Sequence, residues 1–215
     1  MSVTVLTSAT AKRLTTEANV RLDLGLPGTA PTKAQIERFI DQASARAASY
    51  CRRQFGRETV RERFEATCRS GEDGLGLLLE RGPVVRILGV TTDSVALGTD
   101  AYETDGRALY LLDAGARRRW YGRAIVVDYE TGWLLPGEAR GDPPTAALDL
   151  PADVEAAVIK LVGAMISASG RDAMVKSEDV EGIGSTSWYV QGATAALSHP
   201  EAEAALADYR RLLFA

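Results

Sequence analysis

The chain has 215 residues, a length that fits one domain or one domain carrying an inserted subdomain. Hydrophobic residues make up 46% of it and charged residues 25%, which indicates an ordinary globular protein and excludes an intrinsically disordered one. The formal net charge is −4, so long-range attraction to DNA is not expected, because that affinity comes from neutralising phosphates with basic side chains.

No targeting or membrane-spanning segment is expected. The first residues lack the charged region and long apolar region of a signal peptide. The most apolar run, residues 154–166, is too short to cross a bilayer and contains Glu155 and Lys160. We therefore expect a soluble protein that is made in a cytoplasm and has no membrane partner.

The N-terminal part has the pattern of helices. A first helix is expected from about Ser8 to Val20, and the glycines and prolines of residues 24–31 end it. Thr32 then opens a second helix, with Gln35 three residues later as in a capping box. Its apolar stripe consists of Ile36, Phe39, Ile40, Ala43, Ala47 and Tyr50. Gly56 is predicted to end this helix in the left-handed conformation.

The middle of the chain, residues 57–133, has the pattern of short strands and turns. Strands are expected over residues 59–67, 84–90, 102–104, 108–111 and 124–129. In the first of them Val60 and Phe64 lie among charges, which indicates a half-buried strand. The pair Asp105-Gly106 supplies the positive φ values of a tight hairpin turn.

The C-terminal part returns to the helical pattern after a loop over residues 134–150. Pro151 opens a third helix, and Gly170 ends it. The apolar stripe of that helix is Val154, Ala157, Val158, Leu161 and Met165. Ser198 and Glu201 predict a second capping box, which opens a final helix. Its stripe is Ala202, Leu206, Tyr209 and Leu213.

These patterns predict an α+β fold. The N-terminal helices (1–56) and the C-terminal helices (151–215) form a helical bundle, and an antiparallel β subdomain (57–150) is inserted between them. The helices are expected to pack together because each apolar stripe needs a partner.

Residues with catalytic chemistry are few. His199 is the single histidine, and we interpret it as an exposed residue at a helix start instead of a general base. Cys51 and Cys68 are interpreted as small buried hydrophobes, because no zinc-binding spacing surrounds them. Phosphate-binding and dinucleotide-binding glycine motifs are absent. We expect no enzyme activity, cofactor or metal site; the alternative is a small hydrolase or transferase with an unrecognised site.

Two stretches are candidates for binding. Arg117, Arg118 and Arg119 precede Trp120 and Tyr121, so they either face DNA or form a solvated loop with Trp120 packed beneath it. The second stretch holds the carboxylates of Glu178, Asp179 and Glu181 and the aromatic residues Trp188 and Tyr189. We interpret it as a flexible acidic loop that becomes ordered when Trp188 and Tyr189 anchor to a neighbouring protein.

The order of segments resembles the head–tail connector (adaptor) family of long-tailed phages and phage-derived gene transfer particles. The motifs that carry the resemblance are residues 35–43 (QIERFIDQA) with 50–53 (YCRR), 81–90 (RGPVVRILGV), 102–105 (YETD), 126–133 (VVDYETGW), 150–157 (LPADVEAA) and 207–211 (ADYRR). They spread over almost the whole chain, and their order and spacing carry more weight than any single motif.

The resemblance implies a dodecameric ring under the portal that extends the DNA channel and presents a surface to the next head-closure or tail component. Its partners would be the portal, that next component, other copies of itself and DNA that passes without specific binding. It would belong to the virion at the head–tail interface, after assembly in the host cytoplasm. An acidic chain suits such a conduit, since phosphate-neutralising contacts would hold the DNA. The alternative within this class is a head-closure stopper or a tail terminator.

The C-terminal end is the expected portal-docking site. The residues concerned are Tyr209, Arg210, Arg211, Leu212, Leu213 and Phe214. Leu212 and Phe214 lie off the apolar stripe of the final helix, and exposed apolar groups often mark a partner surface. Arg210 and Arg211 would pair with carboxylates of the partner. The alternative is that Phe214 folds back onto its own core.

Overall fold

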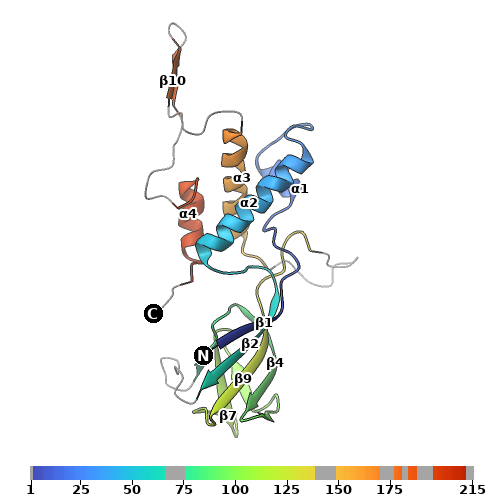
Figure 1. The fold of residues 1–215 in the computed structure, drawn as a ribbon, viewed down its shortest axis with the longest axis vertical. Helices are drawn as coiled ribbons and strands as arrows, with labels where there is room; N and C mark the ends of the chain where they lie inside the picture. Colours follow the sequence, from blue (N-terminus) through green and yellow to red (C-terminus); the bar gives the residue numbers. More distant parts are fainter. Residues whose placement is uncertain are drawn as a thin grey trace. The chain divides into compact units, whose positions relative to one another are not determined.

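The computed structural model describes residues 2–65, 76–138, 149–169, 177–180, 184–187 and 196–211. The chain divides into two compact units (Figure 1). Unit 1 contains Met1–Thr10 and Gly56–Trp133, and unit 2 contains Ala11–Phe55 and Leu134–Ala215. Antiparallel strands build unit 1 and the helices α1 to α4 lie in unit 2, so the mixed α+β class is confirmed.

The larger sheet of unit 1 has the strand order β1-β2-β9-β4-β5, and all neighbouring strands are antiparallel. Its strands are β1 (Ser2–Thr7), β2 (Glu58–Glu65), β9 (Ala124–Thr131), β4 (Val84–Thr92) and β5 (Val95–Ala96). Every second residue of β9 is buried, because successive side chains of a strand point to opposite faces. The strands predicted near β2, β4 and β9 are confirmed.

A smaller sheet completes unit 1, with the order β3-β7-β6 and β8 paired to β7. Its strands are β3 (Leu77–Leu78), β7 (Ala108–Asp113), β6 (Tyr102–Thr104) and β8 (Ala116–Arg118). Residues of both sheets share one apolar core that includes Val60, Phe64, Leu77, Leu79, Val90, Leu109, Ile125, Val127 and Tyr129. A core shared by the two sheets gives unit 1 its own source of stability.

The predicted hairpin between β6 and β7 is confirmed, although Asp105 and Gly106 have different tasks in it. Only Gly106 takes a positive φ, of 88°. The Asp105 carboxylate accepts hydrogen bonds from the N–H groups of Arg107 and Ala108, at 2.9 and 2.7 Å. The bonds from Ala108 and Arg107 lower the pKa of Asp105, because they favour its charged form.

The predicted first helix is present, but its bounds, Ser8 to Val20, are wrong: α1 spans Glu17–Asp23. Residues 2–7, which the sequence pattern assigns to the helical N-terminal part, form strand β1. Val and Thr alternate along β1, and their branched side chains favour a strand. The helix begins after Thr16, whose Oγ1 accepts a hydrogen bond from the Asn19 N–H at 3.3 Å.

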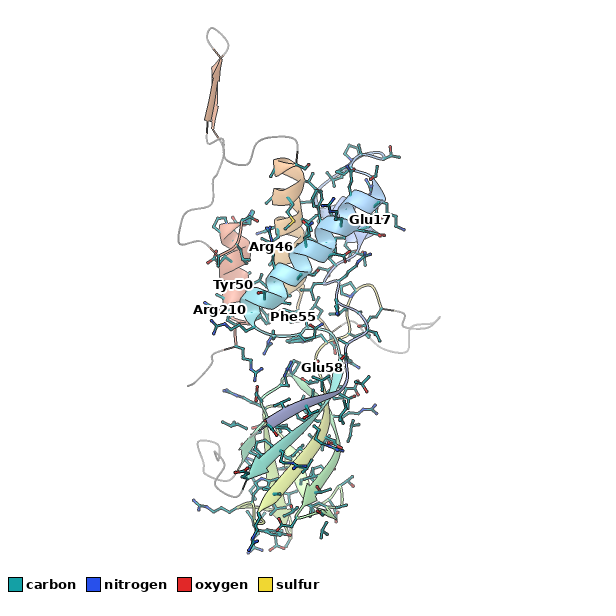
Figure 2. All side chains as sticks on the ribbon, viewed as in Figure 1. Glu17, Arg46, Tyr50, Phe55, Glu58 and Arg210 are labelled. Atoms are coloured by element: carbon teal, nitrogen blue, oxygen red, sulfur yellow. The ribbon has the colours of Figure 1, made fainter. Side chains whose placement is uncertain are left out.

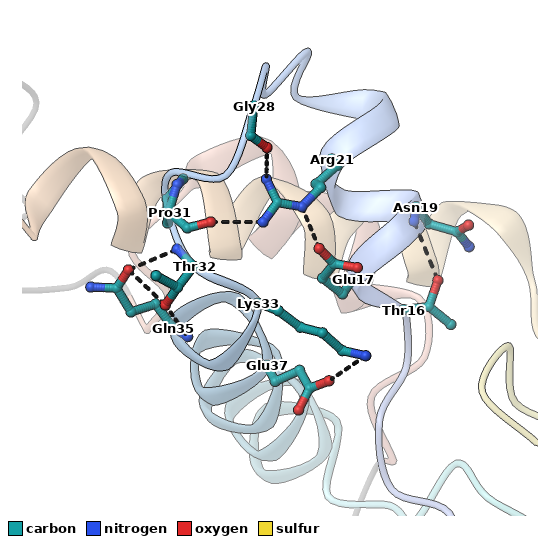
Figure 3. A network of polar contacts seen from close by, with 10 residues as sticks. All are labelled: Thr16, Glu17, Asn19, Arg21, Gly28, Pro31, Thr32, Lys33, Gln35 and Glu37. Carbon is teal, nitrogen blue, oxygen red and sulfur yellow. Dashed lines mark hydrogen bonds and ion pairs between the residues drawn. The ribbon is translucent and has the colours of Figure 1, made fainter.

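Arg21 holds the turn between α1 and α2 (Figure 3). Its guanidinium donates to the carbonyl oxygens of Gly28 and Pro31, at 3.1 and 2.7 Å, and pairs with Glu17 one helical turn earlier. These bonds satisfy carbonyls of the Gly/Pro stretch that separates the two helices.

The capping box that opens α2 (Lys33–Cys51) is confirmed. The Thr32 hydroxyl accepts from the Gln35 N–H, and the Gln35 side chain accepts from the Thr32 N–H at 2.9 Å (Figure 3). The predicted stripe is largely buried: Ile36, Ile40, Ala43 and Ala47 are inaccessible, whereas Phe39 and Tyr50 are half-buried.

The predicted end of α2 at Gly56 is wrong. Arg52 takes the left-handed conformation with φ 53°, and the helix ends before it at Cys51. Gly56 instead forms an isolated β-bridge with Trp133. A glycine five residues beyond the last helical residue cannot act as its cap, so position 52 adopts that conformation despite its side chain.

The third helix, α3 (Ala152–Ala168), follows Pro151 as predicted. Its buried face contains Val154, Ala157, Val158 and Leu161 from the predicted stripe, with Ile159 and Val162 in addition. Met165 is half-buried, and Gly170 lies outside the described residues.

The final helix, α4 (Pro200–Ala207), begins one residue later than predicted and ends earlier than the predicted stripe requires. His199, not Ser198, is its N-cap: Nδ1 accepts from the Ala202 N–H at 3.4 Å. Ala202 and Leu206 are buried as predicted. The helix stops at Ala207, so Tyr209 is not part of it, and Leu213 lies outside the described residues.

The N-terminal and C-terminal helices pack on one another within unit 2. Helix α2 contacts α3 and α4, α3 contacts α4, and α1 contacts both α2 and α3. A polar contact joins the two chain parts: the Glu155 carboxylate accepts from the Thr15 hydroxyl at 2.8 Å and from the Asn19 amide at 2.7 Å. Among the described residues, no helix combines the length and apolar character needed to cross a membrane.

Candidate functional site

Two pairs of arginines flank the place where two distant chain segments touch in unit 2. Arg52 and Arg53 follow the last residue of α2, and Arg210 and Arg211 follow α4. We call these four residues the arginine cluster. The Arg211 N–H donates to the Cys51 carbonyl oxygen at 2.9 Å, and the Arg210 guanidinium lies 5.0 Å from the ring centre of Tyr50 (Figure 2).

The end of α2 explains why the segment after α4 lies there. The last carbonyls of a helix have no partner within the helix and need donors from elsewhere. The backbone N–H groups of Arg52 and Arg53 donate to the carbonyl oxygens of Ser49 and Ala48, at 3.2 and 3.1 Å. The Arg211 N–H donates to the carbonyl oxygen of Cys51. Cationic side chains are also favoured at this end, where the helix dipole is negative.

A tyrosine fixes the same segment from the other side. The Tyr209 hydroxyl lies 2.8 Å from each carboxylate oxygen of Asp153, to which it donates. Burial raises the pKa of Tyr209 to about 12, and the hydrogen bond to Asp153 and the charges of Asp153 and Asp208 act in the same direction. Tyr209 therefore stays neutral and holds the chain beside the first turn of α3.

Charge is concentrated in the arginine cluster. Burial lowers the pKa of Arg53, and the positive charge of Arg211 lowers it further. Closely placed guanidinium groups bind carboxylates or phosphates well, because the planar fork of donors matches their paired oxygens. The arrangement can therefore hold an anionic group of a partner.

Of the six residues predicted to dock on a partner, the structure describes three. Tyr209, Arg210 and Arg211 lie together on unit 2, in the contacts given above, whereas Leu212, Leu213 and Phe214 lie outside the described residues. Sequence reasoning did not assign Arg52 and Arg53 to a site. The available signal was a pair of arginines directly after an amphipathic helix.

The arginine run of unit 1 is largely occupied with its own partners. Arg117 pairs with Glu103 at 2.6 Å and lies 3.8 Å above the Tyr110 ring. Arg118 pairs with Asp113, and Arg119 is exposed. Trp120 donates to the Leu109 carbonyl at 3.0 Å and packs on the core. The expected loop is wrong for Arg117 and Arg118, which lie in strand β8, because this segment pairs with β7.

The acidic stretch differs from the predicted loop where the structure describes it. Glu178 and Asp179 lie in strand β10 (Ser177–Val180), which pairs with β11 (Gly184–Ser187). Glu181, Trp188 and Tyr189 lie outside the described residues. Val180 pairs with Gly184, and the hydrogen bonds of the ladder favour a hairpin over the open loop expected from the acidic composition.

The candidate catalytic residues have structural tasks. His199 caps α4 with its Nδ1 atom. Burial raises the pKa of the Cys51 thiol to about 11, although Arg53 and Arg210 act against this, so the thiol is protonated at neutral pH. Cys68 lies outside the described residues. Within the described part of the chain, no group of three or more His, Cys, Asp or Glu residues is placed to hold a metal ion.

Comparison with known proteins gives a likeness in structure. No family model matches the chain, and no curated protein matches it. A chain in the neck of a native gene transfer agent particle, computed with C12 symmetry, has a TM-score of 0.53 and 15% identity. A chain in the neck of the empty particle, computed with C6 symmetry, has a TM-score of 0.53 and 16% identity. A chain of the native virion of such a particle has a TM-score of 0.55 and 17% identity. Each match covers 100% of this chain and 98% of the other. At identities this low, the structural likeness shows a shared fold and nothing beyond it.

Proposed function

We propose that this protein is a structural protein of the virion neck, a head–tail connector that forms a ring under the portal and extends the DNA channel. One observation carries the proposal: the fold matches chains from the neck of gene transfer agent particles over its full length. The C12 symmetry of one of those necks supports a ring of twelve copies. The motifs spread along the sequence point to the same class.

The chemistry of the described residues agrees with a role in assembly. A ring subunit needs contact surfaces instead of a catalytic pocket. The imidazole of His199 is used as a helix cap, and the Cys51 thiol is buried and protonated. Neither is prepared to act as a base or nucleophile in the way that an acyl-transfer enzyme requires.

The portal would dock on the arginine cluster. We infer that Arg210 and Arg211, together with Arg52 and Arg53, pair with carboxylates of the portal, while residues 212–214 add apolar contact. Charge-assisted bonds between guanidinium and carboxylate groups are strong and directional, which suits a fixed register between two rings. The β10–β11 hairpin, with Glu178 and Asp179, would contact a neighbouring subunit or the portal.

DNA would pass the ring without being held. The chain carries a net charge of −4, and both Arg117 and Arg118 are paired with carboxylates. Paired arginines release few counterions from DNA, so they add little to non-specific affinity. Weak affinity lets the genome slide in during packaging and out during ejection.

Deletion of the gene tests the proposed function. Electron microscopy of particles made without this protein should show filled or empty heads without tails, and the protein supplied from a plasmid should restore tails. Cryo-electron microscopy of the complemented particles should place the ring directly on the portal. Density separated from the portal by another ring would instead favour a stopper or tail terminator, and normal tailed particles from the deletion would refute a neck role.

A charge-reversal variant tests the portal contact. The variant Arg210→Glu/Arg211→Glu should lose binding to portal rings in a pull-down. The matched control is Arg119→Glu/Arg123→Glu, which reverses two exposed arginines of unit 1 and should bind normally. Both variants should keep the melting temperature within a few degrees. Normal binding by the first variant would contradict docking through the arginine cluster.

A further inference from the structure

The five-stranded sheet of unit 1 has two open edges in the part of the chain that the structure describes. At one edge, β1 pairs with β2 and with no second described strand. At the other edge, β5 covers β4 only at Thr91 and Thr92, and the Leu97 N–H donates to the Val90 carbonyl at 2.9 Å. On the side away from β9, residues 85–89 of β4 have no described strand beside them.

Strand β1 lacks two of the features that usually protect an edge strand. Exposed edges are commonly blunted by charged side chains, by proline, by β-bulges or by short length. In β1 only a register shift between Val5 and Thr7 is of this kind. The six residues of β1, SVTVLT, include no charged residue, proline or glycine, and five of the six are exposed. Val5 and Leu6 are 40% and 47% exposed. This edge offers a row of backbone groups and apolar side chains that suits pairing with another chain.

The edge of β4 presents apolar groups of the same kind. Its register shifts at Val85 and again at Leu88, and these two residues are 38% and 47% exposed. Arg86 lies between them, and its charge is paired with Glu130 at 2.6 Å. Because the charge of Arg86 is paired, an uncharged strand could lie along this edge without burying an unpaired charge of β4.

We propose that β1 of one copy lies along β4 of the next copy in the ring, with Val5 and Leu6 against Val85 and Leu88. This inference rests on the proposed function and deepens it by naming the contact between subunits. A closed ring is built from head-to-tail contacts, in which every copy presents two different and complementary surfaces. The two edges of one sheet meet that requirement, and their contact extends the sheet from copy to copy.

Pairing between two β1 strands would not serve the same purpose. Such a contact uses the same surface on both copies, so it closes after two copies and builds no ring of twelve. The two kinds of pairing therefore predict different cross-links. Leu6 would lie near Leu88 of a neighbour in the ring, and near another Leu6 in a two-fold pair.

Cysteine cross-linking distinguishes these outcomes. Leu6→Cys protein and Leu88→Cys protein are mixed, assembled on portal rings and oxidised, with the unsubstituted protein as the control for Cys51 and Cys68. We expect linked dimers in the mixture and none above control in either variant alone. The double variant should give a ladder of linked copies. Cross-linking of Leu6→Cys protein with itself, or no cross-link in the mixture, would overturn the proposal.

A second measurement does not depend on oxidation. Leu6→Lys and Leu88→Lys should each raise the concentration needed for half-maximal ring assembly by on the order of tenfold, because an ammonium group would be buried against apolar side chains. Leu22→Lys, at an exposed leucine of α1, should assemble normally. Melting temperatures of all three should match. Normal assembly by both edge variants would contradict the proposal.

The outcomes separate this inference from the proposed function. If particles contain no ring of this protein at the neck, the proposed function fails. If the ring is present and the mixed cysteine variants do not cross-link within it, only the β1–β4 contact fails.

Discussion

The Tyr129 hydroxyl donates to Oε2 of Glu62 at 2.8 Å, and both side chains are inaccessible inside unit 1. Two backbone groups complete the contact: the Glu80 N–H donates to the Glu62 carboxylate at 3.0 Å, and the Arg81 N–H donates to the Tyr129 oxygen at 3.1 Å. A buried carboxylate is costly unless hydrogen bonds replace its water. The network therefore anchors the segment before β4 to the inner face of the sheet.

The first prediction concerns this network. Tyr129→Phe should lower the free energy of unfolding by about 1–3 kcal/mol, because the buried carboxylate of Glu62 loses a donor and the Arg81 N–H loses its acceptor. Burial raises the pKa of Tyr129, so the hydroxyl is present over the whole accessible pH range. Urea unfolding followed by circular dichroism measures the change. Tyr121→Phe, at an exposed tyrosine, should change stability by less than about 0.5 kcal/mol.

The second prediction concerns the helix interface. Leu161 is inaccessible on the buried face of α3, so Leu161→Ala should cost about 2–5 kcal/mol in unfolding free energy through lost burial and a residual cavity. Leu22→Ala in α1 removes an exposed leucine and should be nearly neutral. A loss of less than about 1 kcal/mol for Leu161→Ala would mean that α3 does not face a core.

The third prediction is a pH dependence. The pKa of Tyr209 is raised from 10.0 to about 12 in the folded protein, so folding favours the neutral phenol. Its contribution to stability is complete below pH 10 and is lost as pH rises toward 12. The stability difference between the native protein and Tyr209→Phe should therefore be constant at neutral pH and shrink across that range. A difference that grows with pH would contradict the assigned hydrogen bond to Asp153.

The fourth prediction concerns the thiol of Cys51. A thiol with a pKa of about 11 and no exposure should react slowly with iodoacetamide at pH 8, since the thiolate is the reactive form. Mass spectrometry should find Cys51 unmodified in the folded protein and modified after denaturation. Rapid labelling of Cys51 in the folded protein would show that its thiol is not buried against α4, where it donates to the Leu206 carbonyl oxygen at 3.4 Å.

The fifth prediction separates docking from self-capping at the chain end. Truncation after Arg211 removes residues 212–215 and leaves Tyr209, Arg210 and Arg211 in place. If the removed residues dock on the portal, the melting temperature should stay within a few degrees while binding to portal rings is lost. If Phe214 covers its own core, the truncated protein should lose thermal stability instead. Normal portal binding by the truncated form would refute docking by these residues.

The fold class and the apolar faces of the helices and strands could be predicted from the sequence, because they depend on periodic patterns within one element. The capping box of Thr32 and Gln35 and the stripe through Ile36 and Ile40 are local relations between neighbours on one helix. The β-branched residues of β9 likewise predict a strand without knowledge of its partners.

Sequence reasoning failed where long-range contacts decide. Strand β1 looked like the start of a helical region, because its pairing partner β2 lies more than 50 residues away in the sequence. The end of α4 depends on contacts of Tyr209 and Arg211 with Asp153 and Cys51. The burial of Glu62 could have been predicted from the sequence: Glu62 shares the alternation of Val60 and Phe64, so it lies on the buried face of β2.

The arginine cluster could not be predicted as a site because it forms only in three dimensions. Arg53 and Arg210 are separated by more than 150 residues and meet because the chain after α4 supplies a donor to the end of α2. A helix end that lacks internal partners for its carbonyls predicts that some donor will arrive, but not which one.

The division of the chain sets an order of events during translation. Strand β1 leaves the ribosome before β2 and has no partner until β2 follows, and the five-stranded sheet closes only when β9 has been made. Helix α2 gains its packing partners later than β1 does, because α3 begins at Ala152 and α4 at Pro200. Unit 1 can therefore complete its core while the nascent helices α1 and α2 still present apolar faces, which remain uncovered until α3 and α4 have been made.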